Sequence, residues 1–278
     1  MSYKTLLVHL QIGQSNQAVL DVARQLAEKH QAAVLGVAAL QKTQSLHEED
    51  NVFFANRIEQ GRPIYQARLN ATETEFNTAL QGIADTEWRH GETYHTVAEH
   101  LAEEARGADL VIVSADQPMQ TPIQSHEFHL AELVALAGRP VLGVPRAPSA
   151  PLSFAHGMVY WKDTVETRRA VAGALPLLKQ ADRVTLVQTA STSDLRAKRQ
   201  QMDLVVQWFK RHGIIVDPVV LDSSGDDAAR LRAFGAELKP DFAVAGTYSH
   251  SRGLRERVFG GVTRDMLRHI DRCVLLSH

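Results

Sequence analysis

Short apolar runs recur along the chain and alternate with amphipathic stretches. Residues 5–10, 110–114 and 242–245 are apolar almost throughout, which is typical of strands buried on both faces of a sheet. Residues 16–29 instead repeat apolar side chains every three or four positions, which predicts a helix. Strands that alternate with helices in this way predict an α/β fold whose parallel sheet is covered on both faces.

The same reading extends over the whole chain. In the first half it predicts strands at 5–10, 33–38, 87–90, 110–114 and 140–144, and helices at 16–29, 64–83, 94–106 and 127–137. In the second half it predicts strands at 157–161, 183–187, 214–221, 242–245 and 273–276, helices at 166–178, 195–211 and 226–238, and a last helix that starts near Gly260. The polar stretch 41–62 is interpreted as a loop or irregular insertion.

The two halves repeat one element order. Residues 145–151 hold three prolines in seven positions, which predicts a stiff extended linker between them. Residues 108–113 correspond to 240–245, and 138–144 correspond to 271–277. The repeat unit is the size of a domain, so we expect an internal duplication with domains at 1–147 and 153–278.

Composition narrows the class of protein. The 278 residues are enough for two domains, and 44% hydrophobic and 22% charged residues are typical of a soluble globular protein. A formal net charge of -2 argues against nucleic acid or an anionic membrane as partner. The chain shows neither a signal peptide nor an apolar run near the ~20 residues that span a bilayer. A cytoplasmic protein is therefore expected, whose one cysteine, Cys273, is an inert strand residue.

One stretch, residues 246–263, carries candidate chemistry. Gly246 ends an apolar strand, a polar loop follows, and Gly260 and Gly261 precede a helix that Thr263 can cap. Free amides and the positive end of the helix dipole would converge there, as an anion requires. A solvated arginine-rich loop is the alternative, because no Walker P-loop and no Gly-x-Gly-x-x-Gly fingerprint is present. Five loop residues add donors or positive charge: His250, Ser251, Arg252, Arg255 and Arg257.

The stretch resembles the C-terminal signature of the universal stress protein family, in which Gly, two residues, Gly, nine residues, Gly and Ser or Thr hold a nucleotide. Two departures stand out, because Ser249 replaces the second glycine and Gly253 looks like an insertion. The positions that agree are Gly246, Tyr248, His250, Ser251, Arg252, Leu254, Arg255, Glu256, Gly260, Gly261, Val262 and Thr263.

The resemblance covers nearly the whole chain and implies a fold. It implies two tandem doubly wound domains, each a five-stranded parallel sheet with helices on both faces, similar to the adenine nucleotide alpha hydrolases. It also implies that the two halves form an intramolecular pseudo-dimer through their last strands, 141–144 and 274–276. A homodimer of the chain is a further expectation, because family members commonly pair through this strand.

The resemblance further implies a nucleotide site in the second half, with ATP or another phosphate-bearing nucleotide as ligand. The family's aspartate after strand one is Lys162 here, and it is Gln11 in the first half, where the loop after residue 114 also lacks glycine. We therefore expect weak, phosphate-dominated binding in the second half and none in the first. The implied binding residues are Tyr160, Lys162, Val187, Ala245, Gly246, Ser249, His250, Arg252, Gly260, Gly261, Val262 and Thr263.

Three functions remain open from the sequence. The leading one is a tandem universal stress protein, a cytoplasmic stress-response or signalling module. A scaffold that binds no nucleotide and acts through protein contacts is the second. A nucleotide hydrolase is least favoured, because no catalytic base and no Mg²⁺ site can be named. The pairs His126/His129 and His95/His100 lack a third ligand, so we expect no metal site.

Overall fold

The protein is described from a computed structural model. It covers residues 2–41, 48–115, 130–146, 148, 152–223, 225–247, 261–268 and 271–278, without the side chains of residues 48–61, 264, 267 and 268. The strands are β1 Thr5–His9, β2 Ala33–Gln41, β3 Thr86–Thr93, β4 Leu110–Ser114, β5 Val141–Val144, β6 His156–Tyr160, β7 Arg183–Ala190, β8 Val216–Asp222, β9 Phe242–Gly246 and β10 Cys273–Ser277. The helices are α1 Gln17–His30, α2 Glu48–Ala79, α3 Val97–Glu104, α4 Leu130–Leu136, α5 Val165–Leu178, α6 Leu195–Arg211, α7 Asp227–Leu238 and α8 Gly261–Arg268, with a 3-10 turn at Ala105–Gly107.

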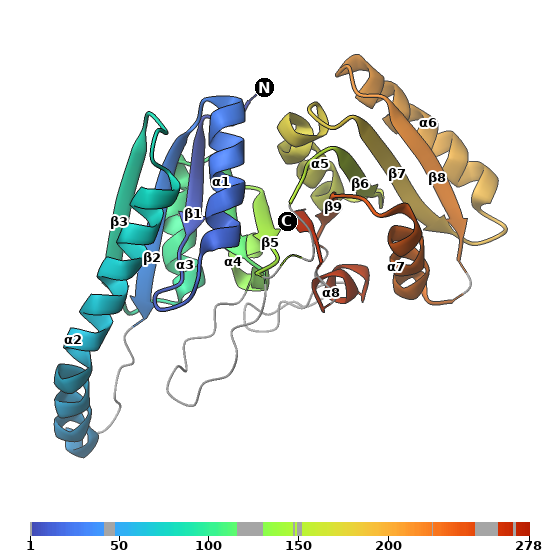
Figure 1. Ribbon diagram of the computed structural model, residues 1–278. Coiled ribbons are helices and arrows are strands. Elements are labelled where there is room, and N and C mark those ends of the chain that lie inside the picture. The colour runs from blue at the N-terminus through green and yellow to red at the C-terminus, as the bar shows by residue number, and fades with distance from the viewer. Residues whose placement is uncertain are drawn as a thin grey trace.

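All the described strands belong to one sheet, in the order β3-β2-β1-β4-β5-β10-β9-β6-β7-β8. Within each half the strands are parallel, which confirms the predicted α/β fold of two doubly wound five-stranded units. Figure 1 shows the two halves side by side, with the C-terminus at the junction between them.

The two halves meet through their last strands. Strands β5 and β10 pair antiparallel, with Leu275 opposite Leu142 and Leu276 opposite Val141. This pairing was predicted from the sequence, and it makes one continuous sheet out of two. A hydrogen bond of 2.8 Å from the Tyr3 hydroxyl to the carbonyl of Gly173 also links the halves, away from the sheet.

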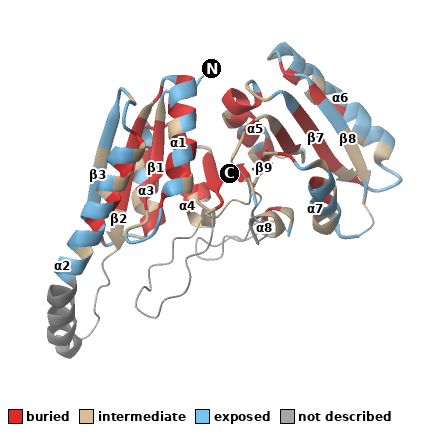
Figure 2. Cartoon of the chain, viewed as in Figure 1, coloured by how far each residue is buried: buried red, intermediate tan, exposed pale blue. Residues whose placement is uncertain are grey.

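Helices cover both faces of the sheet. Leu26 of α1, Phe76 of α2, Leu175 of α5 and Phe209 of α6 share one buried cluster on the first face, and this cluster runs through both halves. Helices α3 and α4 cover the other face in the first half. Helices α7 and α8 do so in the second half. Buried residues therefore follow the strands while the outer surfaces of α1 and α6 are exposed (Figure 2).

The expected loop at 41–62 is wrong in large part. Strand β2 extends to Gln41, and α2 begins at Glu48 and ends at Ala79, whereas the sequence predicted a helix only over 64–83. Pro63 lies inside this helix. A proline removes one helical hydrogen bond and strains the turn before it, but a long helix can continue through such a site. The interpretation of residues 41–62 as a loop therefore misplaced the start of α2.

Other element bounds differ by a few residues. Helix α3 starts at Val97 instead of residue 94, because Thr96 and Glu99 form a capping box with N···O distances of 3.1 and 2.8 Å. Strands β3 and β7 are longer than predicted, since each continues alongside its neighbour to Thr93 and Ala190. In the described part of the chain, no helix is long and apolar enough to cross a membrane.

Candidate functional site

The candidate site lies where the sheet order changes direction in the second half, at the carboxyl ends of β6 and β9. In doubly wound sheets this crevice is where ligands bind. Tyr160 lies opposite Val187 on one side and opposite Ala245 on the other. Three of the residues that the sequence nominated are therefore neighbours across three adjacent strands.

Gly246, at the end of β9, is required by packing within the protein. A Cβ atom at this position would lie 2.3 Å from the backbone nitrogen of Thr167 and 2.6 Å from the carbonyl carbon of Glu166. Both belong to the first turn of α5, whose start Thr164 caps by accepting a hydrogen bond of 3.3 Å from the Thr167 amide. The strand end and the helix start thus touch through backbone atoms, so only glycine fits.

Thr263 does not cap α8 as expected. The helix begins at Gly261, so Thr263 lies within its first turn and is buried. Its hydroxyl donates to the carbonyl of Gly246 across 3.4 Å, which ties the start of α8 to the end of β9. The end of β9 is also held to β10, because the Thr247 amide donates to the Ser277 carbonyl at 2.9 Å.

Gly261 faces open space. Among the described residues, no atom lies within 4 Å of a Cβ atom placed there, and Gly261 is exposed. Gly261 is the first residue of α8, so this open position lies beside the first amide groups of the helix. Lys162, two residues past β6, is exposed as well. Of the other nominated residues, Ser249, His250, Arg252 and Gly260 lie outside the described residues.

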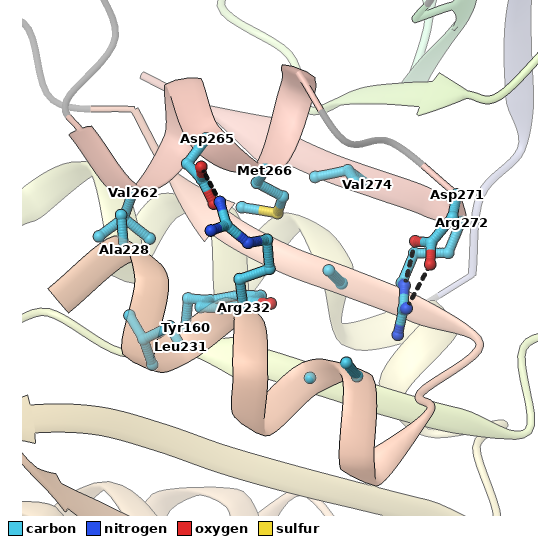
Figure 3. Close-up of a pocket in the computed structure, with 13 residues that line it drawn as sticks. Tyr160, Ala228, Leu231, Arg232, Val262, Asp265, Met266, Asp271, Arg272 and Val274 are labelled. Carbon is cyan, nitrogen blue, oxygen red and sulfur yellow. Dashed lines mark hydrogen bonds and ion pairs between the residues drawn. The ribbon is translucent and has the colours of Figure 1, made fainter. Parts of the chain in front are cut away.

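A pocket of about 180 Å³ lies beneath α8, between α7 and the sheet (Figure 3). Tyr160 and Val262 line it, and the phenol of Tyr160 lies near the backbone of Gly235 in α7. Burial raises the pKa of Tyr160 to about 12, so this phenol stays neutral at physiological pH. The pocket is smaller than the roughly 300–1,000 Å³ of typical ligand sites, so it cannot enclose a nucleotide.

Two ion pairs flank this pocket. Arg232 contacts Asp265, and Arg272 binds Asp271 through two hydrogen bonds of 2.6 and 2.7 Å. The Arg272 hydrogen bonds hold the pKa of Asp271 below its usual value, so both groups are charged. The charge of Arg272 is matched by that of Asp271, so this arginine adds no net positive charge beside the pocket. The pair Arg232–Asp265 was not recognised from the sequence, because its two residues lie on different helices.

The equivalent place in the first half is filled by the protein's own side chains. Asn16 is buried and its amide group bonds the backbone of Gln11 and Gln14 and the carboxylate of Glu75, at 2.8–3.2 Å. Arg146, which follows β5, donates to the side chains of both glutamines. The loop after β1 is therefore held in place by hydrogen bonds to Glu75 of α2 and to Arg146, which follows β5. Sequence reasoning named Gln11 but missed Asn16, Glu75 and Arg146, since nothing local signals contacts across 59 or 132 positions.

A metal centre has no support within the described residues. They contain no group of three or more His, Cys, Asp or Glu side chains that could hold an ion. His126 and His129 lie outside the described part of the chain, and His95 instead contacts Glu99 at 3.8 Å.

Comparisons with known proteins bear on the fold. No protein-family model matches the sequence, and no curated protein does. Among solved structures, a universal stress protein from Archaeoglobus fulgidus DSM 4304 matches with a TM-score of 0.69 at 12% identity, over 98% of this chain and 97% of that chain. A functionally unknown protein from Pseudomonas aeruginosa PAO1 matches with a TM-score of 0.60 at 14% identity, over 99% and 92%. The protein therefore has, along nearly its whole length, the fold of a universal stress protein.

Proposed function

We propose that the chain is a tandem universal stress protein, a cytoplasmic stress-response module whose second half binds phosphate groups weakly. The fold supports this, as does the signature stretch that follows β9. The observation that carries the proposal is the open space at Gly261, the first residue of α8. Amides at a helix N-terminus bind anions through hydrogen bonds and the helix dipole.

Recognition of the nucleoside is the weak part of this site. Lys162 stands where the family's nucleotide binders place a carboxylate, so no acceptor meets the ribose hydroxyls there. A lost charged hydrogen bond costs about 1.5–3 kcal/mol, which is roughly ten- to a hundredfold in affinity. The bulky Tyr160 adjoins Val187 and Ala245 at the same edge of the sheet. Binding energy would therefore come from phosphate groups and little from adenosine.

In the proposed module, the first half is a structural partner of the second half. Its equivalent loop is held by Asn16, Glu75 and Arg146, so a nucleotide would have to displace several internal hydrogen bonds. A scaffold that binds no nucleotide at all is the alternative function, and the internal hydrogen bonds of the loop after β1 are compatible with it. A hydrolase is not favoured, because no base is placed beside Gly261 among the described residues.

Calorimetry of the full chain tests the proposal. Pyrophosphate and ATP should bind with similar dissociation constants in the millimolar range, and adenosine should not bind. Replacement of Gly261 by Asp places a negative charge in the open space and should abolish phosphate binding. The matched control is Gly107→Asp, another glycine whose added Cβ would meet nothing within 4 Å.

Mass spectrometry of the denatured protein, purified without added nucleotide, gives the second readout. We expect no stoichiometric ATP in the supernatant. Micromolar ATP binding, or co-purified ATP, would show an intact nucleotide site and overturn the weak-site proposal. Absence of binding by pyrophosphate and ATP alike would favour the scaffold.

A further inference from the structure

A second cavity lies on the other face of the sheet, between α5 and α6 of the second half. Its volume is about 510 Å³, within the range of small-molecule sites. Val171 of α5, which is buried, contributes to its lining together with Trp161, Leu204 and Trp208. The cavity is separate from the pocket beneath α8, because α5 and α6 pack on the face of the sheet opposite α7 and α8.

Two indole rings from different segments line this cavity. Trp161 follows β6 directly, and its amide donates to the Val187 carbonyl at 2.7 Å, which fixes the backbone that carries the ring. Trp208 projects from α6 and is held by ring contacts with His212 and Phe209, at centroid distances of 4.4 and 5.2 Å. Both rings pack partly against the core, so they are positioned before any ligand arrives.

The mouth of the cavity is polar but carries no net charge. Asp163 and Arg168 line it and contact each other at 3.5 Å, each with a side chain that is 60% exposed. Arg168 also donates to the Thr164 carbonyl at 3.2 Å, which holds its guanidinium at the rim. A ligand would therefore meet both an acceptor and a donor, and a full charge on the ligand would be repelled by one of the two.

One lining residue is exposed although it is apolar. Leu204, one helical turn before Trp208 in α6, has 75% of its surface accessible. Large apolar side chains exposed beside an aromatic cavity are typical of ligand grooves. Planar rings stack well on the faces of indoles.

From this arrangement we infer that the cavity between α5 and α6 binds a neutral, planar heteroaromatic molecule of one or two fused rings. The rings lie against Trp161 and Trp208, and the polar edge of the molecule meets Asp163 and Arg168. The site does not depend on phosphate binding at Gly261.

Nuclear magnetic resonance of the full chain provides the test, with 4-quinazolinone as the probe. This bicycle is neutral and carries an N–H donor and a carbonyl acceptor on one edge. The chain has three tryptophans, so three indole N–H signals report on binding. We expect saturable shifts of the Trp161 and Trp208 signals, assigned through single Trp→Phe variants, and no shift of Trp88.

A matched pair of exposed residues provides the control. Leu204→Arg adds a charge at the mouth of the cavity and should weaken quinazolinone binding at least fivefold. Ile215→Arg changes an apolar residue that is 87% exposed and does not line the cavity, so binding should stay the same. Both positions are at the surface, so both variants should fold.

Three results would overturn the inference. The first is the absence of any saturable shift at Trp161 and Trp208. The second is equal weakening by Leu204→Arg and Ile215→Arg, which would place the probe elsewhere. The third is tighter binding of a charged relative, either quinoline-4-carboxylate or trimethylphenylammonium, which would contradict the neutral rim.

Discussion

Gly246 gives the sharpest test of the packing described above. A Cβ atom at this position would approach the Thr167 nitrogen to 2.3 Å and the Glu166 carbonyl carbon to 2.6 Å. Carbon and nitrogen atoms in contact are normally separated by about 3.5 Å or more, so β9 and α5 would have to move apart by roughly 1 Å. Overpacking of this kind usually costs 1–3 kcal/mol, and here both obstacles are backbone atoms that cannot rotate away. We expect Gly246→Ala to lower the free energy of unfolding by about 3 kcal/mol.

Urea unfolding followed by circular dichroism measures this loss. Gly91→Ala is the matched control, because Gly91 lies in edge strand β3 and an added Cβ would meet nothing within 4 Å. Alanine is preferred over glycine in a strand by up to about 1 kcal/mol, so the control should be neutral or slightly stabilising. If the free energy of unfolding of Gly246→Ala lies within about 0.5 kcal/mol of that of the unmodified chain, the contact between β9 and α5 is not as described. Glycine would then be required at position 246 by a bound ligand and not by packing against α5.

Three further predictions concern burial. Burial, with a smaller effect of His100, lowers the pKa of His9 from 6.5 to about 4. The His9 imidazole of the unfolded chain binds a proton at a higher pH than that of the folded chain. Up to about 3 kcal/mol of stability should therefore be lost as pH falls from 6.5 to 4. His9→Gln should flatten this pH dependence in urea titrations. Burial also raises the pKa of the Cys273 thiol to about 12, so a thiol reagent should label no cysteine in the folded chain and one after denaturation. Leu275→Ala at the junction should lower the free energy of unfolding by about 2–5 kcal/mol in calorimetry, whereas Leu204→Ala, at an exposed site, should lower it little. Equal losses in the two variants would contradict the burial of the junction.

Much of the fold could be predicted because buried parallel strands appear in the sequence as continuous apolar runs. Runs such as 110–114 and 242–245 can only be buried on both faces, and their repetition in one order predicts the duplication. The helical start of residues 48–62 could not be predicted, because its apolar residues, among them Phe53 and Phe54, do not gather on one helical face and Pro63 follows.

The candidate site was only partly predictable. The sequence identified Gly246 as a place of close approach, but it could not tell which backbone approaches, since α5 lies almost eighty positions earlier. The ion pairs Arg232–Asp265 and Arg272–Asp271 change the local charge, and the first of them joins two helices that are distant in the sequence. A pairing between distant helices such as Arg232–Asp265 cannot be recognised from the loop sequence alone.

The central position of β10 has a consequence for how the protein is made. This strand follows every other described strand in the chain, yet it lies in the middle of the sheet, between β5 and β9. Until the ribosome has released residues 273–277, both of these neighbours keep an unpaired, apolar edge. Such edges invite association with other chains, so chains from which β10 is still missing should be prone to aggregate. A chain that stops before residue 273 would lack the strand that joins β5 to β9, so both halves would be damaged at once.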